Sequence, residues 1–216
     1  MYPQRVFERS KERMRHFMRY IVVAIVLTIA SAPTRHCVAQ EKLVHTEMGV
    51  GAGAIYTGLS GVTTDAVALT PRFGFYGEFD FALRIGRYFA IESEVAYGGG
   101  SVVAATPYIE RKIRTSTVDI PLLLSLRLLG SRIRISVGPQ FTVLSKAEYT
   151  LDDQKHYFGP LQPTWNIAGG VGVGISKHFI FKARFVYGLK ESLNQFEGVE
   201  FSTRAYRITA GVALIF

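Results

Sequence analysis

The chain has 216 residues, the length of one domain of ordinary size, and its formal net charge is +8. The charge is concentrated at one end, because residues 1–39 carry seven basic and two acidic side chains and leave only +3 for the rest. A basic footprint confined to a leader argues against nucleic-acid binding by the folded part. Cys37 is the only cysteine, so no intramolecular disulfide can form.

The leader predicts a cleavable secretory signal peptide over residues 1–39. Its basic segment precedes the apolar run IVVAIVLTIA, which is shorter than the ~20 residues that a spanning helix needs. Small residues follow the run, and we favour cleavage after Ala39, with Met14 or Met18 as alternative starts that shorten the basic segment. A retained N-terminal anchor is the other interpretation. The domain that remains after cleavage is 40–216.

Alternating apolar and polar residues predict eight β-strands in this domain. In the segment 72–85, Phe73 and every second residue after it are apolar or glycine, whereas most of the residues between them are polar or charged. The first set forms the apolar face of the strand and the second set its polar face. Strict alternation over more than about six residues indicates a long strand with one face in an apolar medium. The strands are expected at 48–56, 72–85 and 88–97, in a hairpin between Thr115 and Thr150, and at 164–176, 179–189 and 202–216.

The connections alternate between long and short along the chain. Short turns are expected at Gly86-Arg87, Gly130-Ser131 and Lys177-His178. Long polar loops are expected at 57–70, 98–114, 148–162 and 190–200. Outer-membrane barrels combine an even number of strands with short periplasmic turns and longer outer loops. The sequence therefore predicts an all-β fold, an eight-stranded antiparallel up-and-down transmembrane β-barrel in the outer membrane.

A soluble barrel with its apolar face inward is the main structural alternative. The side chains of Phe, Leu, Ile and Val from eight strands would then fill the interior and leave no ligand cavity. The charges favour the membrane barrel, because almost all of them lie on the polar faces of the strands, and an Arg or Lys facing lipid costs about 2–4 kcal/mol at mid-membrane. The polar face of the first strand also carries Gly49, Gly51 and Gly53, and this row of glycines indicates crowding inside a narrow barrel.

The charged residues of the polar face predict a salt-bridged lumen. An eight-stranded barrel is only wide enough for its own side chains, and buried charges need partners. We therefore expect acids and bases from different strands to pair across the interior as a structural plug, with a gated ion path as the alternative. The expected network comprises Glu78, Asp80, Arg84, Glu92, Glu94, Asp119, Arg127, Arg134, Lys182 and Arg184.

The central hairpin carries a family resemblance. Its first strand contains the run 118–124 (VDIPLLL), Gly138-Pro139-Gln140 follows after the short turn, and the last strand includes Arg207–Phe216. These segments resemble the PorT-like outer-membrane β-barrel family of Bacteroidota-type bacteria. The resemblance implies an outer-membrane barrel, and the founding member of that family is linked to a secretion apparatus for surface proteins and gliding.

No catalytic, cofactor or metal motif accompanies the strand pattern. An enzyme that modifies lipid A would need a Ser with a His and an acid at the membrane edge, and the loop residue His156 belongs to no His-x-Ser pair. We therefore expect a protein that is not an enzyme and uses no cofactor, with a structural or interaction role in the cell envelope. A small passive pore is the alternative, and a lipid A-modifying enzyme is the third class.

The expected partners follow from this location. The barrel wall would contact outer-membrane lipid, and the outer loops would contact envelope or secretion proteins. The barrel-assembly machinery would recognise the C-terminal strand, with the aromatic residue Phe216 as the assembly signal.

Overall fold

The structure is a computed structural model, and it describes residues 44–60, 66–151 and 154–216. The predicted signal peptide, its cleavage site and both alternative start sites lie outside these residues. Within the three described ranges, no helix is long and apolar enough to cross a membrane.

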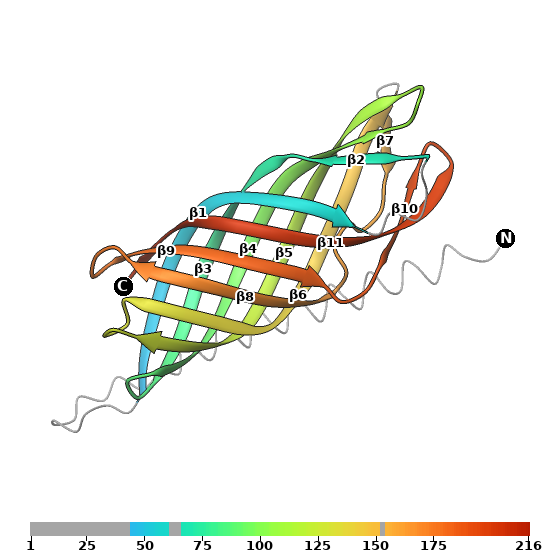
Figure 1. Ribbon diagram of the computed structural model, residues 1–216. Coiled ribbons are helices and arrows are strands. Elements are labelled where there is room, and N and C mark those ends of the chain that lie inside the picture. The colour runs from blue at the N-terminus through green and yellow to red at the C-terminus, as the bar shows by residue number, and fades with distance from the viewer. Residues whose placement is uncertain (1–43, 61–65, 152–153) are drawn as a thin grey trace. The chain divides into compact units, whose positions relative to one another are not determined.

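Eight antiparallel strands close into a barrel (Figure 1). Each ring strand pairs with the next one along the chain, and β11 returns to pair with β1, with Val50 opposite Leu214. The ring strands are β1 (Val44–Ser60), β3 (Phe73–Ile85), β4 (Phe89–Ala105), β5 (Glu110–Leu128), β6 (Ile133–Leu151), β8 (Trp165–Gly174), β9 (Phe179–Gly188) and β11 (Val199–Ile215). The predicted eight-stranded antiparallel barrel is therefore confirmed.

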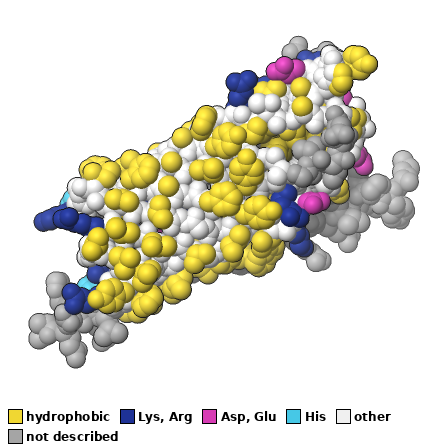
Figure 2. Space-filling model, viewed as in Figure 1, with side chains coloured by type: hydrophobic (Ala, Val, Ile, Leu, Met, Phe, Trp, Pro, Cys, Tyr) yellow, Lys and Arg dark blue, Asp and Glu magenta, His cyan; other side chains and the backbone are white. Residues whose placement is uncertain are grey.

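The apolar side chains of the membrane-spanning strands point away from the barrel interior. On β3, Phe73 and Phe75 are 77% and 64% exposed, whereas Tyr76 and Glu78 are buried. Hydrophobic side chains cover the visible wall, and charged side chains gather toward its two ends (Figure 2). A soluble barrel would have the opposite polarity, so the wall is a lipid-facing surface.

Aromatic side chains pack in pairs on this outward face. Phe141 and Trp165 lie edge to face with ring centroids 4.5 Å apart, and Tyr56 and Phe73 lie 5.3 Å apart. Trp165 and Phe73 begin their strands at the end of the barrel opposite the short turns. Aromatic residues prefer the level of the lipid headgroups, so these pairs mark the outer boundary of the membrane.

The segments predicted as long outer loops are largely β-structure. The prediction is wrong over most of 98–114, because β4 continues to Ala105 and β5 begins at Glu110. Three short strands extend the sheet further at the same end: β2 (Ala68–Pro71) pairs with β4, β7 (Gln154–Tyr157) with β6 and β10 (Ser192–Phe196) with β11. Beyond the membrane the outward face no longer has to be apolar, so the alternation that reveals strands in lipid is lost.

An apolar core fills this outer extension of the barrel. Phe158 and Phe196 are almost fully buried there, and both pack against neighbouring aromatic rings, Phe158 on Phe201 and Phe196 on Tyr149. The backbone holds Phe158 in place, because its N–H donates to the carbonyl of Ala147 at 2.8 Å. The interior face is therefore polar within the membrane and apolar beyond it, which closes the outer end of the lumen.

The glycine row of β1 faces the crowded interior, as the sequence indicated. A Cβ atom on Gly53 would lie 2.2 Å from the carbonyl oxygen of Ala210 and 2.8 Å from the ring of Tyr76. A Cβ atom on Gly51 would lie 2.8 Å from a carboxylate oxygen of Glu78. Only glycine leaves room for these inward side chains.

Candidate functional site: the charged lumen

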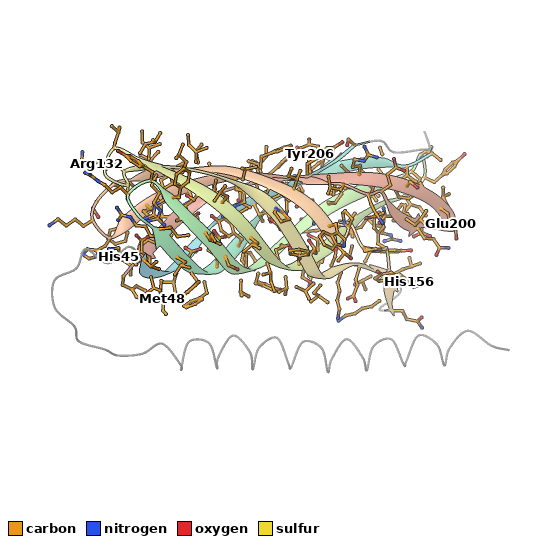
Figure 3. The ribbon with its side chains drawn as sticks, turned by 90° about the horizontal axis from the view of Figure 1, so that it is seen from below. His45, Met48, Arg132, His156, Glu200 and Tyr206 are labelled. Carbon is orange, nitrogen blue, oxygen red and sulfur yellow. The ribbon has the colours of Figure 1, made fainter. Side chains whose placement is uncertain are left out.

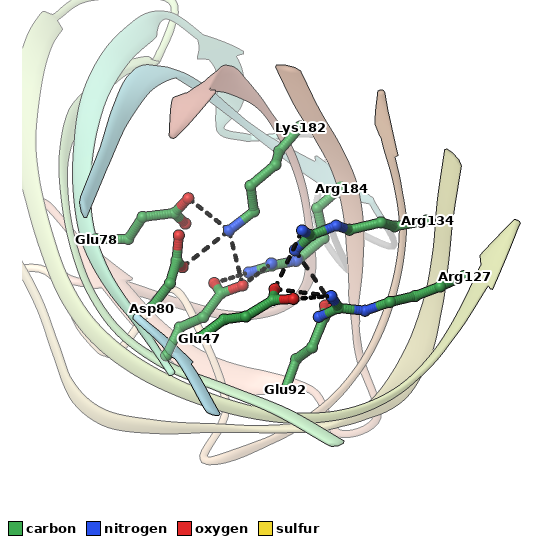
Figure 4. A network of polar contacts seen from close by, with 9 residues as sticks. Glu47, Glu78, Asp80, Glu92, Arg127, Arg134, Lys182 and Arg184 are labelled. Carbon is green, nitrogen blue, oxygen red and sulfur yellow. Dashed lines mark hydrogen bonds and ion pairs between the residues drawn. The ribbon is translucent and has the colours of Figure 1, made fainter. Parts of the chain in front are cut away.

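The layer of charges nearest the short turns is centred on Arg127 of β5. Its guanidinium donates to both carboxylate oxygens of Glu47 at 2.6 and 2.7 Å and to Glu92 at 3.3 Å. Arg134 on β6 donates to the same Glu47 carboxylate at 3.2 Å (Figure 4). Arg127 is only 1% exposed, so two acids and two bases from four strands neutralise one another inside the barrel.

The second layer is built around the ammonium group of Lys182 on β9. Its Nζ donates to Glu78 at 2.7 Å and to Asp80 and Glu94 at 2.9 Å (Figure 4). Arg184, two residues along the same strand and on the same face, holds Glu94 through both of its terminal nitrogens. A forked guanidinium–carboxylate contact of this kind is geometrically specific as well as strong.

The third layer, toward the outer end, pairs Asp119 with Arg207. The Arg207 guanidinium donates to Asp119 at 2.7 Å and to the hydroxyl of Thr117 at 2.8 Å. The hydroxyl of Thr142 donates to the other Asp119 oxygen at 2.6 Å, and Asn166 donates to Thr142 at 3.0 Å. Neutral hydrogen-bonding groups thus complete the polar filling below the apolar core.

Little free space remains between these layers. Cavities of 40 and 20 Å³ separate the first layer from the second and the second from the third. A water molecule needs roughly 10–15 Å³ of such space, so the two cavities have room for about one to four waters each. The geometry favours a packed polar interior over a continuous aqueous path.

The three carboxylates of the second layer could in principle hold a metal ion. Oxygens of Glu78, Asp80 and Glu94 lie within 4.8 Å of one another. The Lys182 ammonium contacts all three groups and so occupies the place that a cation would take. The layer is a carboxylate cage filled by the chain's own cation.

The structure brings nine of the ten residues of the expected network into ion pairs across the lumen. Arg84 is different, because it has no ion pair within the described chain and its Nε donates to the carbonyl of Gly86 in the adjoining turn at 3.2 Å. Two residues were absent from the expected set, Glu47 and Arg207. Both lie at positions of their strands whose side chains point into the barrel. Glu47 was missed because β1 begins four residues before the predicted strand.

The remaining candidate residues lie at the two ends of the barrel. The structure places His45 near the short turns and His156 in the outer extension (Figure 3). The His156 ring stacks on Tyr149 at a centroid distance of 5.4 Å, which gives it a packing contact. Nδ1 of His178 lies 3.3 Å from the carbonyl oxygen of Ile215.

A closed barrel of eight strands with a lipid-facing wall and a polar, side-chain-filled interior defines a small outer-membrane protein. Residues 38–194 match the family described as Outer membrane protein beta-barrel domain, and the chain belongs to this family. The protein is located in the outer membrane, as its sequence predicted. The match is to this broad family and not to the PorT-like family specifically.

Three solved structures are similar to this chain. Neisserial surface protein A is 15% identical with a TM-score of 0.53, and the alignment covers 78% of this chain and 97% of that one. OprG of Pseudomonas aeruginosa is 10% identical with a TM-score of 0.49, covering 79% and 95% of the two chains. Ail of Yersinia pestis, in complex with the heparin analogue sucrose octasulfate, is 10% identical with a TM-score of 0.49, covering 79% and 99%. At 15% identity, the likeness to Neisserial surface protein A shows the fold alone. Comparison with curated protein sequences gives no match.

Proposed function

We propose that the protein is a non-enzymatic barrel with a structural or interaction role in the cell envelope. The observation that carries this proposal is the closed interior: three layers of paired charges fill the membrane-spanning part, and an apolar core fills the outer extension. A barrel filled in this way offers its partners a rigid surface, and recognition is concentrated on the parts that project from the scaffold.

The outer extension supplies that surface. Tyr108, at the tip of the β4–β5 hairpin, is 93% exposed, and Leu193 on β10 is 75% exposed. Lys112, Arg114 and Lys146 are also exposed on neighbouring strands, and none of them forms an ion pair with any residue that the structure describes. Exposed aromatic and cationic groups on a rigid sheet are suited to contact with another envelope component.

The resemblance of the central hairpin to the PorT-like family suggests what kind of component this is. We propose a secretion or surface assembly of the envelope. The test is a mild-detergent pull-down of the tagged protein from its own outer membrane, read by mass spectrometry. The double variant Tyr108→Ser/Leu193→Ser is compared with Tyr88→Ser, which removes an exposed tyrosine at the opposite, short-turn end.

Stoichiometric envelope proteins captured by the wild type and by Tyr88→Ser, but lost from the double variant, would support the interaction role. A barrel without partners would contradict it. A passive pore makes a separate prediction, because single-channel recordings would then show a large steady conductance. An enzyme acting on lipid A through His156 would leave an altered lipid A profile when His156 is replaced by Ala, and we expect an unchanged profile.

We also propose that the barrel-assembly machinery recognises the last strand through Phe216. In support, Phe216 exchanges two backbone hydrogen bonds with Met48, at 2.9 and 3.1 Å, where the first and last strands meet. Its side chain is 66% exposed on the wall. Phe216→Ala should accumulate as unassembled protein, whereas Phe179→Ala, which removes another exposed phenylalanine near the same end, should assemble normally. Equal assembly of the two variants would contradict the proposal.

A further inference from the structure

The short-turn end of the barrel opens into a vestibule of 820 Å³. It is lined by the turns at Gly130-Ser131 and Lys177-His178 and by the first and last strands. The Arg127 layer forms its floor, so the vestibule is blind. In outer-membrane barrels the short turns face the periplasm, and this space is therefore open to periplasmic solutes. Its volume is within the roughly 300–1,000 Å³ typical of small-molecule sites.

The vestibule is strongly basic. Four cationic side chains line it, from Arg84, Arg132, Arg134 and Lys177, and Glu47 is the only acidic side chain among its described lining residues. Glu47 is already engaged by the Arg127 layer. Neither Arg132 nor Lys177 forms an ion pair with a described residue, and Figure 3 shows Arg132 at this end of the barrel. The other two cations have partners, because Arg134 pairs with Glu47 and Arg84 donates to the carbonyl of Gly86. Arg132 and Lys177 are therefore the two free cations of the vestibule.

The backbone that carries the two free cations is held in place. The carbonyl of Arg132 accepts a hydrogen bond from Gly174 at 2.7 Å, which ties its turn to β8. The hydroxyl of Ser176 accepts from the backbone N–H groups of His178 and Phe179, which fixes the turn that contains Lys177. Because these anchors exist before any ligand arrives, less ordering is required when an anion binds.

We propose that this vestibule is a binding site for a small phosphate-bearing anion presented from the periplasm. Guanidinium groups form forked contacts with phosphate oxygens, and three of the four lining cations are arginines. The phosphate could belong to a soluble molecule or to a lipid headgroup of the inner leaflet. Ile175 and Phe216, each 66% exposed at the rim, place the opening next to that leaflet. The site is independent of the outer extension and of the interaction role proposed for it.

The test uses the full-length folded barrel in phosphatidylcholine nanodiscs, with inorganic pyrophosphate as the probe and isothermal titration calorimetry as the readout. The double variant Arg132→Gln/Lys177→Gln removes the two free cations of the vestibule. Lys112→Gln/Lys155→Gln removes the same net charge from the outer extension and serves as the matched control. Both sites are exposed, so both variants should fold, and a difference in migration between boiled and unboiled protein on a gel verifies this.

We expect the vestibule variant to bind pyrophosphate about tenfold more weakly than the wild type, with the control unchanged. Affinity weaker than about 1 mM in the wild type would overturn the proposal, as would equal losses in the two variants, which would indicate only a long-range effect of net charge. Repeating the titration with phosphatidylglycerol in the nanodisc distinguishes the sources. Weaker pyrophosphate binding there identifies a lipid headgroup as the occupant, and unchanged binding identifies a soluble anion.

Discussion

Replacing Lys182 by Met removes the cation that holds the second lumen layer together. Among the residues that the structure describes, Lys182 is the only ion-pair partner of Glu78 and of Asp80, whose side chains are 2% and 11% exposed, whereas Glu94 keeps Arg184. Breaking a buried ion pair by removing one partner costs about 3–5 kcal/mol. Two acids lose their partner, but the loss does not double, because a carboxyl group left without a cation can take up a proton and become neutral.

We therefore expect the free energy of unfolding to fall by about 3–5 kcal/mol in Lys182→Met, as measured by urea unfolding in lipid vesicles. The triple variant Lys182→Met/Glu78→Gln/Asp80→Asn removes the orphaned charges and should recover most of the loss. Lys112→Met, on the exposed surface of the extension, should change stability by less than about 0.5 kcal/mol. A loss below about 1 kcal/mol in Lys182→Met, or no recovery in the triple variant, would refute this account of the lumen.

Three further changes test other parts of the structure. Gly53→Ala forces the backbone to shift and should lower the unfolding free energy by about 1–3 kcal/mol, whereas Gly77→Ala, whose added Cβ meets its nearest atom at 3.8 Å, should be tolerated; equal effects would contradict the crowding argument. Val171→Arg on the lipid-facing wall should cost about 2–4 kcal/mol in vesicles and Leu193→Arg on the outer extension about 0–1 kcal/mol, and equal costs would argue against the assigned membrane boundary. Phe158→Ala removes a fully buried ring from the apolar core and should destabilise the outer extension locally by about 3–5 kcal/mol. The extension should then be proteolysed faster while the barrel keeps its heat-dependent migration on a gel. Unchanged proteolysis would contradict the role of this core in closing the outer end of the lumen.

Lipid imposes a rule on each residue of a membrane-spanning strand, and the strands could be predicted wherever that rule applied. A membrane-spanning strand must be apolar on alternate residues, so the number of strands and the inward direction of residues such as Glu78 and Lys182 followed from parity alone. The same rule explains the failure at 98–114. There Val102 and Ala104 turn inward toward an apolar core while solvent replaces lipid outside, so the alternation no longer distinguishes the faces.

The number of strands, the lipid-facing wall and most of the charges that enter the lumen could be predicted from the sequence. Which of those charges meet one another is known only from the folded barrel. Arg127 and Glu47 are 80 residues apart in sequence, and Lys182 and Glu78 are 104 apart. Their contact depends on the stagger of the strands and on the seam between β1 and β11, which together set the height of every inward side chain. Whether a side chain points inward depends on its own strand alone. Its height along the barrel axis depends on how all eight strands are staggered around the closed ring. The ion-pair partners therefore could not be predicted from the sequence.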